Sequence, residues 1–191
     1  MTRPNFIVGI GGSAGGLAAY KCLFDALSPR TGMGFVIVAH LLPNASSQLA
    51  LILTRHTTMK VVVAANGTAI RRNTVYVIPP NADLLMEGAT LKVVSPRTGR
   101  NKQIDLFFGS LAECTGTRAI GVVLSGYDGD GTEGCKQIKE RGGTTFAQDA
   151  SAEVNEMPRH ADESGNVDFV LSPAEIAGAL QVMAAATGGT R

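Results

Sequence analysis

The sequence has no tryptophan, only 5% aromatic residues and no uninterrupted hydrophobic run longer than five residues. A membrane-spanning helix needs about 20 apolar residues, so the sequence predicts no direct membrane insertion. The N-terminal segment does not show the longer apolar stretch of a signal peptide. We therefore expect a cytoplasmic protein.

Cysteine is also scarce, with three residues at Cys22, Cys114 and Cys135. They form no CxxC pair, and an odd number cannot complete a disulfide framework. Their wide separation is not typical of zinc ligands either. We expect three reduced cysteines that pack in the protein, and we expect neither a metal ion nor a cofactor.

Charge of one sign does not dominate, because 17 Lys and Arg residues face 16 Asp and Glu residues, a formal net charge of +1. Such a balance produces no field strong enough to favour nucleic acid or an anionic membrane as the main partner. The length of 191 residues and the 45% hydrophobic content suit one hydrophobic core. We expect a single domain over residues 1–191, with its core at about 5–182.

Short β-branched runs alternate with stretches of helical periodicity along most of the chain. This alternation is typical of an α/β fold with helices on both faces of a mostly parallel sheet, a three-layer, doubly wound arrangement. The capping box Ser172-Pro173-Ala174-Glu175 predicts the start of a C-terminal helix. The expected strands are 6–8, 35–39, 60–65, 119–124, 144–147 and 167–171, and the other expected helices are 17–27, 46–56, 105–115 and 132–141.

The middle of the chain departs from this alternation. Asn66-Gly67 and Glu87-Gly88 are hairpin-type turns, and apolar segments at 75–78, 84–86 and 91–94 surround them. We expect these segments to form an antiparallel hairpin at one edge of the sheet. The polar stretch 95–103 that follows predicts an exposed loop, and it carries the densest basic cluster of the chain: Arg97, Arg100 and Lys102.

A glycine-rich segment, residues 9–16, follows the first predicted strand. It matches the dinucleotide-binding pattern G-x-G-x-x-G/A and, from Gly11, the nucleophile pattern G-x-S-x-G around Ser13. The glycines are equally compatible with tight packing between helix and strand. A dinucleotide site needs an acidic residue at the end of the second strand, where this sequence has His40, and a histidine there suits a general base beside a serine.

Open parallel sheets hold their sites beyond the carboxyl ends of the strands. Ser13 follows the first predicted strand, His40 ends the second, and both Asp128 and Asp130 follow the strand that ends at Leu124, so three strand ends are expected to bring them to one rim. A serine, a histidine and an acid are the parts of a Ser-His-Asp triad, in a chain order that differs from the α/β-hydrolases. Taken singly, Ser13 is compatible with a helix cap, His40 with a structural strand-end residue, and either aspartate with turn chemistry. The residues alone do not decide between Asp128 and Asp130.

Seven short segments carry a more specific pattern: IGGSAGG (10–16), AHL (39–41), YVIPP (76–80), IDLFF (104–108), LSGYDGDG (124–131), FAQD (146–149) and MPR (157–159). Together they resemble the catalytic domain of chemotaxis protein-glutamate methylesterases of the CheB type. The resemblance extends over about residues 6–180. It is closest to the methylesterase domains that are fused to a receptor methyltransferase. The chain is expected to have no receiver domain of the kind that typically precedes this domain.

The resemblance implies a serine hydrolase that removes methyl esters from glutamate side chains on the cytoplasmic helices of chemoreceptors, in chemotaxis adaptation. It also implies deamidation of particular receptor glutamines. Its expected partners are the methylated receptor helices and a regulatory receiver or methyltransferase domain. The alternatives from the residues are a catalytically inactive domain or a nucleotide-binding α/β signalling module.

The resemblance also assigns roles by position. It implies that Ser13 is the nucleophile, that His40 is the general base, and that Asp130, immediately before Gly131, is the acid that orients the imidazole. The residues that it implies for oxyanion or substrate binding are Ala14, Tyr127 and Met157.

Overall fold

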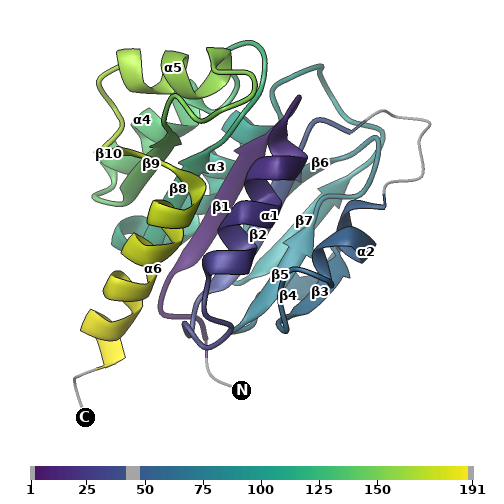
Figure 1. Ribbon diagram of the computed structural model, residues 1–191. Coiled ribbons are helices and arrows are strands. Elements are labelled where there is room, and N and C mark those ends of the chain that lie inside the picture. The colour runs from purple at the N-terminus through teal and green to yellow at the C-terminus, as the bar shows by residue number, and fades with distance from the viewer. Residues whose placement is uncertain (1–2, 42–47, 189–191) are drawn as a thin grey trace.

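Strands from distant parts of the sequence pair side by side in a parallel sheet in the computed structural model, which describes residues 3–41 and 48–188 (Figure 1). Within these residues the sheet has seven strands in the order β10-β9-β8-β1-β2-β5-β3, and every pairing is parallel. The strands are β1 (Ile7–Gly12), β2 (Gly34–Ala39), β3 (Lys60–Val63), β5 (Thr74–Val77), β8 (Ala119–Val123), β9 (Thr144–Gln148) and β10 (Phe169–Leu171).

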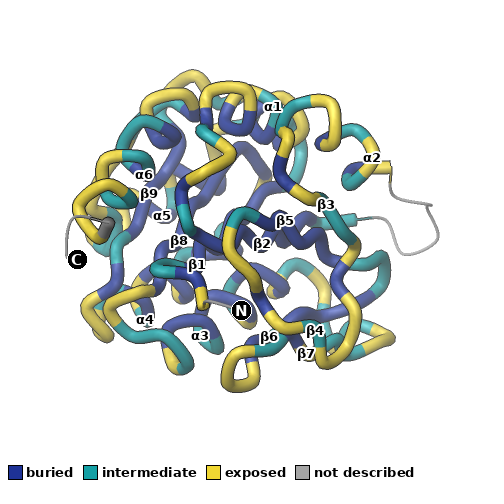
Figure 2. The backbone as a smooth tube through the Cα atoms, turned by 90° about the horizontal axis from the view of Figure 1, so that it is seen from below, coloured by how far each residue is buried: buried dark blue, intermediate teal, exposed yellow. Residues whose placement is uncertain are grey.

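Helices cover both faces of this sheet, and alternate side chains of its strands form two cores. Ile10 of β1 and Ile37 of β2 pack with α1, α2 and α6, whereas Val36 and Val38 pack with α3, α4 and α5. The central strands are accordingly buried between helices whose outer sides are exposed (Figure 2). The helices are α1 (Gly16–Ala26), α2 (Leu49–Leu53), α3 (Gln103–Thr115), the 3-10 turn η1 (Gly116–Arg118), α4 (Thr132–Glu140), α5 (Glu156–Glu163) and α6 (Pro173–Gly188).

A small antiparallel sheet packs beside α3. It consists of β4 (Thr68–Ala69), β7 (Thr90–Val94) and β6 (Asp83–Glu87), paired in that order. The three-layer, doubly wound α/β prediction is therefore confirmed, including its antiparallel element. Among the described helices, none is long and apolar enough to cross a membrane.

The predicted hairpin differs from the structure in one segment. Residues 75–78 were expected among the antiparallel strands, but β5 lies in the main sheet, parallel to both β2 and β3. All four residues of β5 are buried, with Val75 and Val77 in one core and Tyr76 in the other. A strand that is covered on both faces belongs to the interior of a parallel sheet, whereas an edge hairpin leaves one face to solvent.

The helices α2, α5 and α6 compare differently with the sequence. The expected helix 46–56 is α2 over Leu49–Leu53, while residues 46 and 47 lie outside the described residues. Helix α5 was not predicted, because its polar sequence contains Pro158 and few apolar residues. The capping box of α6 is confirmed, since the Ser172 backbone N–H donates to Glu175 Oε2 at 2.9 Å and the Ser172 hydroxyl faces the Glu175 N–H.

Candidate active site

Ser13 and His40 lie next to each other because the two strands that precede them are in register. Gly12, the last residue of β1, pairs with Ala39, the last residue of β2. Adjacent strands are separated by about 4.8 Å, so the residues that follow these two emerge together at the carboxyl edge of the sheet. The His40 backbone N–H also donates to the Gly12 carbonyl at 3.3 Å, which fixes this pairing.

Strand β1 is longer than predicted, and the predicted turn is correspondingly shorter. The expected strand 6–8 continues to Gly12. A Cβ atom at Gly11 would meet Ile104 Cγ2 at 2.6 Å, so glycine lets the first turn of α3 lie directly on the strand. Gly9 and Gly11 of the dinucleotide-like pattern thus serve close packing between β1 and α3.

The turn after β1 presents Ser13 by means of a second glycine. Gly15 has a φ of 73°, a conformation that side chains other than glycine adopt at a cost. A Cβ atom there would also collide with Ser125 Oγ. That hydroxyl donates to the Ala14 carbonyl at 2.7 Å and accepts the Val154 N–H at 3.0 Å. Ser125, which follows β8, therefore joins the turn that carries Ser13 to the segment around Val154.

His40 and Asp130 form a short, buried contact. His40 Nε2 lies 2.6 Å from Asp130 Oδ2, and the two side chains are 7% and 0% exposed. A carboxylate only accepts hydrogen bonds, so the imidazole carries its proton on Nε2 and leaves Nδ1 as a bare acceptor. His40 Nδ1 is buried and has no hydrogen-bond partner among the described residues. No hydrogen bond joins it to Ser13 Oγ in this part of the chain.

The Asp130 carboxylate is held by the first turn of α3. Its Oδ2 accepts the Ile104 backbone N–H at 3.0 Å, and its Oδ1 accepts the Asp105 backbone N–H at 2.9 Å. Helix N-termini stabilise negative charge, so this buried acid has partners for both oxygens. Asp130 is thereby fixed in position and aimed at His40.

Asp128, the other candidate acid, points elsewhere. Its Oδ1 accepts the Asp130 N–H at 3.0 Å, and its Oδ2 accepts a hydrogen bond from Asn101 Nδ2 at 2.6 Å. The Asp128 carbonyl lies 2.8 Å from His160 Nδ1. Asp128 and His160 therefore shape the loop between β8 and α4, and only Asp130 contacts the imidazole of His40.

The three residues expected near the oxyanion or substrate occupy different places. Ala14 and Tyr127 have backbone N–H groups that donate no hydrogen bond within the described chain, and the Tyr127 side chain is 56% exposed. Met157 is fully buried. Its thioether packs against Gly126, on the side where Ser13 Cβ also lies, so Met157 supports the loop from beneath.

The basic loop reaches the same site, which the sequence did not predict. Arg97 lines a small pocket together with His40, Asn81 and Gln103. Buried Asp83 holds the loop there, since Asp83 Oδ2 accepts the Thr98 N–H at 2.6 Å. Burial alone would raise the pKa of Asp83, but hydrogen bonds from Thr98 and Gln103 and the charge of Arg97 keep it below its ordinary value.

Comparison with known proteins identifies the family. A family model described as CheB methylesterase matches residues 8–180. The chain belongs to the CheB methylesterase family.

Among the described residues, no group of three or more His, Cys, Asp and Glu side chains is placed to hold a metal ion.

Individual members of the CheB methylesterase family show how far the likeness extends. A relative from Leptospira interrogans is 37% identical over 174 residues, which cover 88% of this chain and 89% of the relative. The protein-glutamate methylesterase/protein-glutamine glutaminase of Moorella thermoacetica is 34% identical, over 97% of this chain and 46% of its own length. The crystal structure of the Thermotoga maritima CheB methylesterase catalytic domain superposes with a TM-score of 0.85 at 26% identity, covering 96% of this chain and all of that one.

Proposed function

We propose that this chain hydrolyses methyl esters of glutamate side chains on the cytoplasmic helices of chemoreceptors, and that it deamidates selected glutamines there. The observation that carries the proposal is the buried contact between His40 Nε2 and Asp130 Oδ2 beside Ser13. This contact leaves one imidazole nitrogen free at the rim where Ser13 emerges. The names of several family members support the same reaction.

The tautomer of His40 determines which nitrogen acts. Because Asp130 accepts the Nε2 proton, Nδ1 is the nitrogen that takes the proton of Ser13 Oγ. The hydrogen bond between them forms when Ser13 turns toward His40 in the complex with substrate, as catalytic hydrogen bonds often tighten only then. Asp130 stays ionised and stabilises the imidazolium.

The reaction proceeds in two halves. Ser13 Oγ attacks the ester carbonyl carbon, and the N–H groups of Ala14 and Tyr127 stabilise the developing oxyanion. When the bond from the carbonyl carbon to the methoxy oxygen breaks, His40 gives its proton to that oxygen and methanol leaves. Water, deprotonated by His40, then attacks the glutamyl-Ser13 ester and releases the free glutamate, while His40 returns the proton to Ser13 Oγ.

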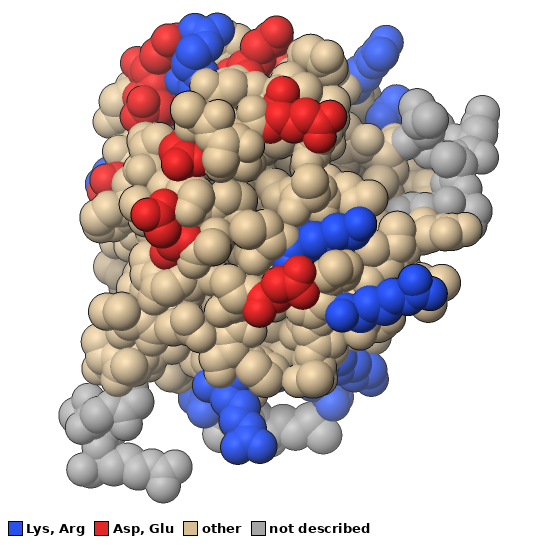
Figure 3. All heavy atoms as spheres, in the orientation of Figure 1, with Lys and Arg blue, Asp and Glu red and all other residues tan. Residues whose placement is uncertain are grey.

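Opposite charges flank this rim and suit a charged helix as substrate. Arg97 stands beside His40 on one side. On the other side lies α5, which contributes Met157 to the site and carries Glu156, Asp162 and Glu163, the last of them paired with Arg159. Acidic side chains lie over α5 at the top of the molecule in Figure 3, with basic side chains among them. We infer that this separation of charge orients the receptor helix on the site. We also infer that the chain acts in the cytoplasm, and that a regulatory receiver or methyltransferase domain is its second partner.

The decisive experiment measures methanol release from methylated receptor. Ser13→Ala removes the nucleophile, so turnover should fall by roughly 10⁴-fold or more, as it does when a triad member is lost. Ser28→Ala, at a serine on the loop after α1, is the matched control and should keep wild-type turnover. If Ser13→Ala kept a tenth of the activity, the nucleophile would be another residue. If the wild type released no methanol, the chain would be an inactive interaction domain.

A further inference from the structure

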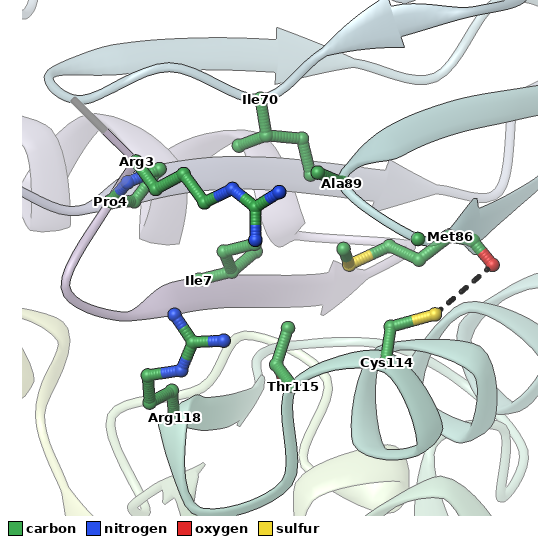
Figure 4. Close-up of a pocket in the computed structure, with 10 residues that line it drawn as sticks. Arg3, Pro4, Ile7, Ile70, Met86, Ala89, Cys114, Thr115 and Arg118 are labelled. Atoms are coloured by element: carbon green, nitrogen blue, oxygen red, sulfur yellow. Dashed lines mark hydrogen bonds between the residues drawn. The ribbon is translucent and has the colours of Figure 1, made fainter. Parts of the chain in front are cut away.

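A second pocket lies at the opposite end of the sheet from Ser13. It has a volume of about 190 Å³ and opens beside Ile7, the first residue of β1 (Figure 4). Ser13 follows Ile7 by six residues, and a strand rises about 3.3 Å per residue, so the two sites are about 20 Å apart. A molecule in this pocket cannot touch the reacting ester.

Two arginines dominate the opening of this pocket. Arg3 comes from the N-terminal segment and Arg118 from η1, and both side chains extend into the opening on either side of Ile7 in Figure 4. Neither guanidinium has a hydrogen bond or ion pair with any described residue. No acidic residue lines the pocket. Two like charges face one opening there without a counter-ion from the described chain.

The position of Arg3 is fixed by its own backbone. Its carbonyl accepts a hydrogen bond from Arg72 Nε at 2.7 Å, and the same guanidinium donates to Asn5 Oδ1 at 2.6 Å. Asn5 is further tied to Gly32 through its N–H at 3.2 Å. The segment that carries Arg3 is therefore anchored to the body of the protein.

The interior of the pocket is mostly apolar, and the Thr115 hydroxyl that also lines it donates to the Leu111 carbonyl at 2.7 Å. Ile7, Ile70 and Met86 are each more than nine-tenths buried and form its floor and wall. The Cys114 thiol on the far side is engaged with the Met86 carbonyl at 3.6 Å. Inside the pocket a ligand therefore finds hydrocarbon and sulfur, whereas at the opening it finds the donors of two guanidinium groups, which suit a carboxylate.

We propose that this pocket, lined by Arg3, Arg118, Ile7, Ile70, Met86 and Cys114, binds a small amphipathic carboxylate. The carboxylate pairs with the two guanidinium groups, and a short hydrocarbon chain covers the apolar floor. The site is separate from the Ser13 rim, and it does not depend on the reaction assigned to that rim.

Binding is tested by titrating the wild-type chain with sodium hexanoate and following backbone amide NMR shifts, since the chain has no tryptophan for fluorescence. The amides of Ile7, Met86 and Cys114 should shift in a saturable way. Hexanamide, which has the same chain without the charge, should not shift them. Acetate should bind more weakly than hexanoate, by up to about fourfold for each methylene group that it lacks.

The arginines are tested by single variants. Arg3→Gln and Arg118→Gln should each weaken hexanoate binding about tenfold or more, because each removes a charge-assisted hydrogen bond. Arg30→Gln, at an exposed arginine elsewhere, should bind as the wild type does. Equal affinity for hexanamide, equal affinity for acetate, unchanged binding by both variants, or no saturable shift would each overturn the proposal. The NMR spectrum of each variant verifies its fold.

Discussion

The Asp130 carboxylate caps the start of α3, and Asp105, in the first turn of α3, caps the start of α4, the helix that follows Asp130. Asp130 accepts the N–H groups of Ile104 and Asp105 in the first turn of α3, at 3.0 and 2.9 Å. Asp105 Oδ1 in turn accepts the N–H groups of Gly131 and Gly134 at the start of α4, at 2.9 and 2.8 Å. This exchange locks the starts of α3 and α4 together around the acid that contacts His40.

The exchange makes Asp105 a positioning residue for the site. Asp105→Ala leaves two N–H groups of α4 without their acceptor, so the loop that carries Asp130 should shift. We expect kcat to fall roughly 10- to 100-fold with KM little changed, since a displacement of about 1 Å can cost that much. Asp105→Asn keeps an oxygen acceptor and should restore most of kcat. Glu113→Ala, at an exposed acid of the same helix, is the control, and an equal loss in the Ala and Asn variants would contradict the positioning role.

The pH dependence of stability gives a second test of Asp105. Burial and the nearby charge of Asp130 raise the pKa of Asp105 from 3.8 to about 6, against the effect of its two backbone hydrogen bonds. The folded state then holds the proton more tightly than the unfolded state. The contribution of Asp105 to the free energy of unfolding is therefore full below about pH 3.8 and is lost as the pH rises through 6.

Urea unfolding of the wild type and Asp105→Asn at several pH values isolates this contribution. The free energy of unfolding of the wild type should fall relative to that of the variant between pH 4 and pH 6, and the difference should be constant above pH 7. Parallel curves for the two proteins across this window would show that Asp105 ionises in the folded protein as it does in the unfolded chain.

The two aspartates of the loop after β8 should behave differently. Asp130→Asn should reduce kcat by about 10⁴-fold, because the amide no longer fixes the tautomer of His40. Asp128→Asn should keep most activity, since its contacts run to Asn101 and to the Asp130 N–H and not to the imidazole. Methanol release by both variants measures this, and the reverse order of effects would transfer the acid role to Asp128.

The sequence predicted the parts of the site that depend on strand order alone. Ser13 and His40 were expected at one rim because each follows a parallel strand, and the pairing of Gly12 with Ala39 brings them together. The choice between Asp128 and Asp130 could not be made from the residues. The choice depends on the path of a loop in which Asp128 has a φ of 67°. The spacing of apolar residues along a sequence does not predict the path of such a loop.

Features that depend on contacts between distant segments could also not be predicted from the sequence. The exchange between Asp105 and Asp130 requires two helix N-termini to meet, and a pattern read along one helix does not show this. Likewise, β5 was expected in a hairpin, because its apolar residues fit either kind of strand. Its place between β2 and β3 follows from burial on both faces.

Gly11 of β1 should link stability to catalysis. Gly11→Ala places a methyl group 2.6 Å from Ile104 Cγ2, closer than van der Waals contact allows, and the Ile104 N–H holds Asp130. Overpacking of this kind typically costs about 1–3 kcal/mol, so we expect a lower free energy of unfolding together with a lower kcat. Gly178→Ala, with open space around its Cα, is the control. Wild-type stability and turnover in Gly11→Ala would show that α3 can move away from β1 freely.

The basic loop should act on substrate association. Arg97 stands beside His40, and Arg100 and Lys102 are exposed on the same loop. Attraction between exposed charges acts mainly on the association rate and weakens with salt. Changing all three residues to Gln should raise KM for methylated receptor several-fold at low ionic strength, with a smaller effect at high salt and none on a small methyl ester. Arg97→Gln alone should account for most of the change because it is nearest the site, whereas Arg30→Gln should leave KM unaltered. If the triple variant and the wild type had equal KM values for receptor at low salt, the loop would be a solvated surface with no part in recognition, and the assignment of Ser13, His40 and Asp130 would be unaffected.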